Sequence, residues 1–177
     1  MVARRLFGVL GAGLIGWGML AVPATADPIR PDSVYRIFWE PYPGYRVVPA
    51  STLARSPVLA LAADGADQWR LLWTPSMSYE PTLRIQNTAS GMCLRPVENK
   101  TTATEIEQGP CNTVAADSAP GDVWLVEPSP SSGSYSITYF ANRTFKMYAN
   151  KAGGNVAAVV VGAAADTTGA RWILTRV

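Results

Sequence analysis

The chain has 177 residues, with 13 acidic and 15 basic side chains, two cysteines and no histidine. The absence of histidine excludes serine–histidine and cysteine–histidine nucleophiles, histidine-ligated zinc and a histidine pH switch, and two cysteines alone cannot form a four-cysteine metal site. The near balance of charge argues against nucleic acid or an anionic membrane as the partner.

Residues 1–26 have the layout of a cleavable secretory signal. Arg4 and Arg5 precede a glycine-rich apolar run over 6–22, and Ala24-Thr25-Ala26 supplies an A-x-A cleavage site. The alternative is an uncleaved membrane anchor, for which the run is short, because a bilayer span needs about 20 residues. The arginine pair also resembles a twin-arginine signal, but the flanking residues fit the Sec route better. Both routes predict a secreted protein, and the short signal rich in alanine and glycine indicates a bacterial host.

Cleavage would leave residues 27–177 without a membrane span. Loss of the two arginines changes 15 basic residues to 13, against 13 acidic ones, so the mature chain would be neutral. Residues 27–33 form a short N-terminal segment, and the rest has the size of one domain.

Both cysteines, Cys93 and Cys111, would remain after cleavage. In an exported chain a disulfide is the natural inference, and two buried free thiols are the alternative. A closed loop of this length stabilises a fold by about 3 kcal/mol.

Short runs rich in β-branched and aromatic residues, bounded by Gly, Pro, Asn and Asp, predict twelve strands and no amphipathic helix. The predicted strands are 34–39, 45–50, 58–63 and 68–73, then 82–87, 92–97, 105–111 and 123–127, and finally 135–140, 144–149, 156–162 and 171–177.

The strands form three sets of four, and each set opens with an isoleucine strand and closes with a tryptophan strand. The marker residues are Ile37, Ile85 and Ile137 at the openings, and Trp69, Trp124 and Trp172 at the closings. A unit of four strands cannot bury both its faces alone, so three copies must share one core. The sequence therefore predicts an all-β fold, a β-trefoil with pseudo-threefold symmetry and repeats at about 34–75, 82–128 and 134–177.

The stretch SGMCLRPVENKTTATEIEQGPCNT at 90–113 carries a family resemblance. It resembles the ricin B-type lectin family, whose β-trefoil repeats close with a Gln-x-Trp signature and often contain an internal disulfide. Here the glutamine positions hold Asp67, Asp122 and Ala170. The first and third units have Arg46 and Phe145 near the position of the first cysteine.

The resemblance implies a sugar pocket built from an aspartate two residues after the first cysteine and an aromatic ring just before the second. In this chain Arg95 takes the place of the aspartate, Gly109 and Pro110 stand where the ring would be, and Met147 is the approximate counterpart in the third unit. Galactose binding in the manner of the family is therefore not expected.

Other residues could bind a ligand. FWEPYPGY at 38–45 places Trp39, Tyr42 and Tyr45 on a turn stiffened by proline, which suits stacking on a sugar or a partner protein. The alternative is that these rings simply pack together. The remaining candidates are Arg95 and Asn99 in the second unit and Tyr148 and Asn150 in the third.

Catalysis by a pair of carboxylates is the chemistry that remains open to a chain without histidine. Glu105 and Glu107 alternate on one face of a predicted strand, an arrangement that more often marks a solvated face than a catalytic pair.

The sequence thus predicts a non-catalytic carbohydrate-binding protein without metal or cofactor, a monomer or the subunit of a secreted complex. The alternative is a module that binds a partner protein, such as the receptor-binding subunit of a secreted toxin or enzyme. An enzyme or a hydrolase inhibitor is a third and weaker possibility.

Overall fold

The structure, a computed structural model, describes residues 26–62, 65–74, 82–97, 103–112, 121–129, 132–150, 156–163 and 168–177. Nearly all of the predicted signal segment and the candidate residue Asn99 lie outside these ranges. Within them, no helix is long and apolar enough to cross a membrane.

All twelve predicted strands are present, and their ends differ from the prediction by three residues at most. The strands are β1 (Val34–Trp39), β2 (Tyr42–Pro49), β3 (Val58–Leu61), β4 (Gln68–Trp73), β5 (Thr82–Asn87), β6 (Cys93–Pro96), β7 (Thr104–Gly109), β8 (Trp124–Pro128), β9 (Tyr135–Tyr139), β10 (Lys146–Asn150), β11 (Val156–Gly162) and β12 (Trp172–Arg176). A single 3-10 turn, η1 (Thr168–Ala170), precedes the last strand in the described part of the chain.

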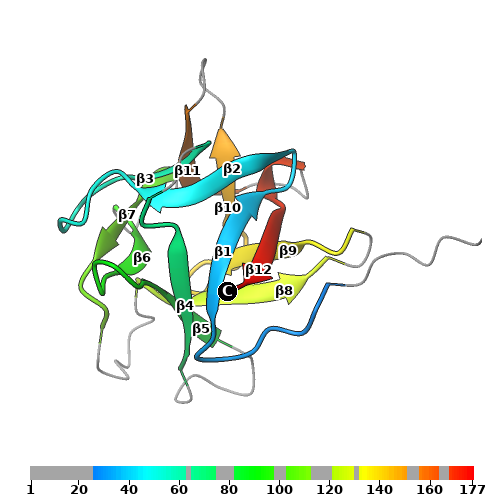
Figure 1. Cartoon of the computed structure of the whole chain (residues 1–177), viewed down its shortest axis with the longest axis horizontal. Coiled ribbons are helices and arrows are strands. Elements are labelled where there is room, and N and C mark those ends of the chain that lie inside the picture. The colour runs from blue at the N-terminus through cyan, green and yellow to red at the C-terminus, as the bar shows by residue number, and fades with distance from the viewer. Residues whose placement is uncertain are drawn as a thin grey trace, which may run out of the picture.

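The first and last strands of the repeats form a barrel, and the middle strands form hairpins (Figure 1). Each first strand pairs with the last strand of its own repeat and with the last strand of the repeat before it, so β1 pairs with β4 and β12. The hairpin β10–β11 also pairs with β3 and β7 of the other two hairpins. This connectivity is the predicted all-β trefoil.

The three marker tryptophans lie in the shared core, as predicted. Their side chains are fully buried, as are those of the three marker isoleucines. Each indole N–H donates to a backbone carbonyl of the second strand of its own repeat, at Val47, Leu94 and Met147, over 2.8, 3.1 and 3.0 Å. A large flat side chain is retained here because it fills the core and keeps its one polar group satisfied.

These three hydrogen bonds align the repeats residue by residue. The residue before each accepting carbonyl is Arg46 in the first repeat, Cys93 in the second and Lys146 in the third. Phe145 and Met147 were expected near the positions of Cys93 and Arg95, and each lies one residue before the exact counterpart. The side chain equivalent to Arg95 is that of Tyr148, because the register of β10 is set by its indole acceptor.

Cys93 and Cys111 form the predicted disulfide, with their Cα atoms 5.0 Å apart. It joins the start of β6 to the residues that follow β7, so the bridge lies within the second repeat. Neither cysteine of the chain is free.

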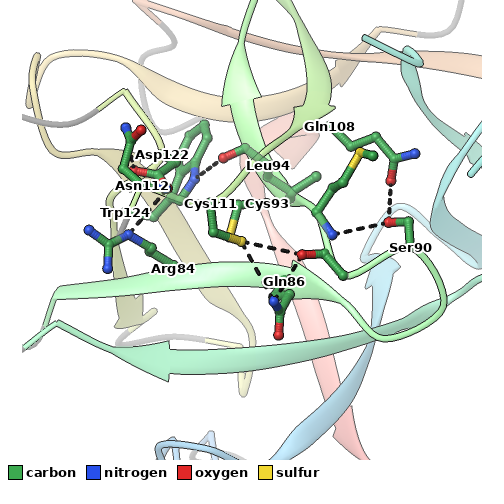
Figure 2. Close-up of a disulfide and its surroundings, with 12 residues drawn as sticks. Arg84, Gln86, Ser90, Cys93, Leu94, Gln108, Cys111, Asn112, Asp122 and Trp124 are labelled. Carbon is green, nitrogen blue, oxygen red and sulfur yellow. Dashed lines mark hydrogen bonds and ion pairs between the residues drawn. A yellow bond between two sulfur atoms is a disulfide. The ribbon is translucent and has the colours of Figure 1, made fainter. Parts of the chain in front are cut away.

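Two of the three positions that carry glutamine in the lectin signature hold buried carboxylates. Asp67 accepts from Arg36 and Arg46, both at 3.0 Å. Asp122 lies 3.2 Å from Arg84 and accepts the backbone N–H of Asn112 (Figure 2). In both repeats the carboxylate ties the turn before the tryptophan strand to an arginine of the first strand.

The third repeat has Ser136 and Ala170 at the positions of this arginine and this carboxylate. It therefore lacks the ion pair that the other two repeats share.

Candidate functional site

The second repeat has a closed surface where the family resemblance implies a sugar pocket. Arg95 lies opposite Glu107 across the β6–β7 pair and donates to its carboxylate at 2.7 Å from Nη2 and 3.0 Å from Nε. A Cβ atom added at Gly109 would clash with the Arg95 guanidinium, so the arginine covers the position where the family has an aromatic ring. The Arg95 guanidinium thus occupies the space over Gly109 in which a sugar would have to bind.

Glu107 is 6% exposed, and its partner is Arg95. The expectation that Glu105 and Glu107 together form a solvated face holds only for Glu105, which is exposed. Glu107 is buried beneath Arg95, whose own side chain is 33% exposed.

The aromatic residues of 38–45 pack against one another at the β1–β2 connection. Trp39 lies opposite Tyr42 in the sheet register, and the register shifts between Phe38 and Trp39. The Tyr42 ring lies 4.8 Å from the Trp39 ring and 5.6 Å from the Tyr45 ring, measured between centroids. Tyr42 is 38% exposed, while Tyr45 is partly buried against the core.

Trp39 is a core residue, which corrects the expectation that its ring faces a ligand. It is 4% exposed, and its indole N–H donates to the Gly169 carbonyl at 3.1 Å. The equivalent position of the second repeat holds Asn87, whose amide donates to the Ala66 carbonyl at 2.6 Å. In both repeats, the last residue of the first strand donates to a backbone carbonyl of the neighbouring repeat. That carbonyl belongs to the residue three positions before the neighbour's marker tryptophan, Trp172 or Trp69. The role of Trp39 is to join repeats, and Tyr42 is the exposed ring that it supports.

A charged pair lies at the same β1–β2 connection as the exposed ring. Glu40, two residues before Tyr42, lies 3.9 Å from Arg171 of the third repeat, and its backbone N–H donates to the Arg171 carbonyl at 3.1 Å. The Nε atom of Arg171 is buried and has no hydrogen-bond partner. We call Glu40, Tyr42, Tyr45 and Arg171 the junction surface, because they lie where the first repeat meets the third.

The sequence did not single out Glu40 or Arg171. An acid next to three aromatic residues is a usable signal for Glu40, but Arg171 is distant in the chain and only the fold brings it close.

The third-repeat candidates lie on the strand that flanks this junction. Tyr148 is half-buried and Asn150 is exposed on β10, and the 3-10 turn η1 packs against β10. The same turn supplies the Gly169 carbonyl that Trp39 binds. The fold therefore gathers the aromatic connection, η1 and β10, whereas Arg95 belongs to the closed surface of the second repeat.

Groups of three or more residues that could hold a metal ion are absent from the part of the chain that the structure describes.

Comparison with known proteins supports the fold and leaves the ligand open. No family model and no curated protein matches the sequence. The designed threefold-symmetric protein ThreeFoil superposes with a TM-score of 0.68 at 15% identity, over 81% of this chain and 99% of that one. The Rhizoctonia solani agglutinin gives 0.67 at 15% identity, over 86% and 100%.

A chain of the cytolethal distending toxin from Actinobacillus actinomycetemcomitans gives a TM-score of 0.64 at 14% identity, over 84% of this chain and 94% of that one. At such identities the likeness is one of fold. The fold is the one that the resemblance to ricin B-type lectins implied.

Proposed function

We propose that the protein is a secreted, non-catalytic carbohydrate-binding protein that binds its glycan at the junction surface. The observation that carries this proposal is the exposed Tyr42 ring, which packs against the rings of Trp39 and Tyr45. A ring fixed in this way loses little conformational entropy when a pyranose stacks on it, and such contacts contribute about 0.5–1.5 kcal/mol.

The charged pair supplies the polar half of the site. Sugars need acceptors and donors for their hydroxyl groups, and the Glu40 carboxylate and the Arg171 guanidinium provide both. Their separation of 3.9 Å is long for a direct hydrogen bond, and each remains about a quarter exposed, so both can turn to a ligand. Glu40 would thus take the role that an aspartate has in the pocket of the lectin family.

The closed second repeat supports this location. With Arg95 bonded to Glu107 and covering Gly109, the described residues at this position offer neither an unpaired carboxylate nor an aromatic ring. We therefore expect plain galactose and lactose to bind weakly, with dissociation constants above about 1 mM. The similarity of fold to an agglutinin is consistent with glycan binding but does not locate it.

The test is a glycan array probed with the wild type, with Tyr42→Ala and with Leu53→Ala. Leu53 is the matched control because it is 71% exposed on the β2–β3 loop and lies outside the junction surface. We expect Tyr42→Ala to lose the glycan signal and Leu53→Ala to keep it, with both variants unfolding cooperatively. Loss in neither variant would remove Tyr42 from the site.

The second candidate function is binding of a partner protein, as a subunit of a secreted complex. The β2–β3 loop favours this second function, because it exposes Leu53 while hydrogen bonds to Gln108 hold its backbone in place. The amide of fully buried Gln108 donates to the carbonyls of Ser51 and Leu53 at 2.6 and 2.8 Å. The loop therefore presents an exposed leucine from a backbone that is held in place, and this side chain could enter an apolar pocket of a partner.

The fold similarity to a toxin chain is consistent with this role. In a pull-down from the native secretome, Leu53→Ala would release a bound protein that Tyr42→Ala retains. An empty pull-down beside a positive glycan array would leave the first function alone.

A further inference from the structure

The N-terminal segment of the described chain crosses one end of the barrel. Ala26 and Ile29 pack against the core, the Asp32 N–H donates to the Leu71 carbonyl at 2.7 Å, and the Leu71 N–H donates to the Ser33 carbonyl at 3.1 Å. Figure 1 shows this segment in blue, running below the barrel before it enters β1. We call residues 26–33 the strap.

A cavity of about 450 Å³ lies between the strap and the end of β12. Its lining residues are Asp27, Pro28, Arg30, Tyr35, Tyr135, Leu174, Thr175 and Arg176. Opposite residues of an antiparallel pair project to the same face, and here Ile37 pairs with Leu174 and Tyr35 with Arg176. Because Ile37 is fully buried in the core, Leu174 and Arg176 lie on the barrel-facing side of β12, where Leu174 is partly buried and Arg176 is exposed at the mouth.

The two tyrosine hydroxyls hold the strap in place. The Tyr35 hydroxyl accepts the Arg30 backbone N–H at 2.9 Å, and the Tyr135 hydroxyl donates to the Asp27 carbonyl. Burial, and then the charges of Asp27 and Tyr35, raise the pKa of Tyr135, so its hydroxyl keeps its proton and donates at neutral pH. The wall of the cavity is therefore a fixed polar frame.

The charge of the cavity is unbalanced. Arg30 and Arg176 make no ion pair within the described residues, whereas Arg36, Arg84 and Arg95 each have a carboxylate partner. Asp27 is the one acidic residue of the lining. Among the lining side chains, the two guanidinium groups, both on exposed residues, outnumber the single carboxylate.

We propose that this cavity is a second binding site, for a small organic carboxylate of the size of an acidic monosaccharide. A planar guanidinium fork matches a carboxylate in two parallel hydrogen bonds, which a neutral sugar cannot offer. The volume falls within the range of small-molecule sites, and the mouth of a β-barrel is one of their usual places. The Thr175 backbone and the tyrosine rings would face the body of the ligand.

The position of the strap adds a dependence on processing. Cleavage after Ala26 would place a new α-ammonium group on Asp27, at the rim of the cavity, and so increase its positive charge. The proposal needs only the two arginines, and we expect the mature chain to bind more tightly than a chain that retains its leader.

Isothermal titration with glucuronate, glucose and inorganic phosphate tests the proposal. We expect glucuronate to bind with a dissociation constant of about 1 mM or below, and glucose not to bind. Arg30→Gln and Arg176→Gln should each weaken glucuronate binding about tenfold, because each removes a charge-assisted hydrogen-bond pair. Arg70→Gln, an exposed arginine on β4, is the matched control and should change nothing.

Equal binding of glucose and glucuronate, absence of glucuronate binding, or unchanged binding in both arginine variants would overturn the proposal. Phosphate binding as tight as glucuronate binding would also overturn it, because the cavity would then select charge alone. Tyr42→Ala should leave glucuronate binding unchanged. A glycan array without hits would therefore count against the junction surface and not against this cavity.

Discussion

The second and third repeats share one backbone plan and use it in opposite ways. At two positions the second repeat has Cys93, which forms the disulfide, and Arg95, which forms an ion pair with the buried Glu107. The equivalent residues of the third repeat are Lys146 and Tyr148. The second repeat also keeps a buried aspartate before its tryptophan, where the third has Ala170 and a 3-10 turn. The side chains that would form a pocket in the second repeat stabilise the fold instead. The third repeat instead contacts the β1–β2 connection of the first repeat, through Gly169 and Arg171.

The largest expected effect tests what the repeats have in common. Trp124→Ala and Trp172→Ala should each lower the free energy of unfolding by about 3–5 kcal/mol, because each empties a fully buried site and removes an indole hydrogen bond. Urea denaturation measures both. Trp73→Ala, at a tryptophan that is 43% exposed, is the control and should cost far less. A small loss at either core position would break the equivalence of the repeats.

Removal of the disulfide should give the next largest loss of stability, and the loss should arise in the second repeat. Replacing Cys93 and Cys111 by alanine together should cost about 3 kcal/mol on the chain-entropy account of a closed loop of this size. The fold should persist, because ten strands lie outside the bridged segment. Thermal unfolding with circular dichroism checks both statements. A chain that no longer folds would show that the bridge supports more than its own repeat.

The ion pair of the second repeat should give a smaller effect. Arg95→Ala leaves the Glu107 carboxylate buried without its partner, at a cost of about 1–3 kcal/mol. At the equivalent position Tyr148→Phe removes only a hydroxyl group and should change stability by less than about 0.5 kcal/mol. Chemical denaturation of the two variants gives the contrast. Equal losses would mean that the Tyr148 hydroxyl stabilises the third repeat as much as Arg95 stabilises the second.

The smallest expected effect lies at alkaline pH. Burial raises the pKa of Tyr135 and of Tyr139 above the usual 10.0, with Asp27 adding to the first and Asp122 to the second. The folded state therefore favours the protonated phenols. This contribution to stability is complete below about pH 10 and is lost as the pH rises through the raised values. Urea midpoints measured across that range should fall, and should fall less steeply in Tyr135→Phe.

The fold was predictable because its signals repeat. Three isoleucine strands and three tryptophan strands at regular spacing specify a shared core, and burial of the marker residues follows from it. The register of β10 could be predicted only approximately, because nothing in its sequence marks which carbonyl accepts the indole of Trp172. For Trp39 the sequence left two interpretations open, a stacking surface and a packed ring. The structure shows a packed ring, and the Gly169 carbonyl that its indole binds is too distant in the chain to be found from sequence.

The candidate site was only half predictable for a related reason. Tyr42 and Tyr45 are close in sequence and could be found as a cluster. Glu40 and Arg171 belong to the first and third repeats, so only the fold brings them together. The sequence showed that Arg95 departs from the lectin pattern, but it did not show that Arg95 pairs with Glu107 and covers Gly109. Register across β6 and β7 decides that point.

The central claim is that the glycan binds at the junction surface and not in the second repeat. A crystal structure with the tightest array ligand tests it most directly. We predict a pyranose ring stacked on Tyr42 with a hydroxyl group on the Glu40 carboxylate, and an intact Arg95–Glu107 pair. A sugar bound between β6 and β7, with Arg95 displaced from Glu107, would contradict the claim.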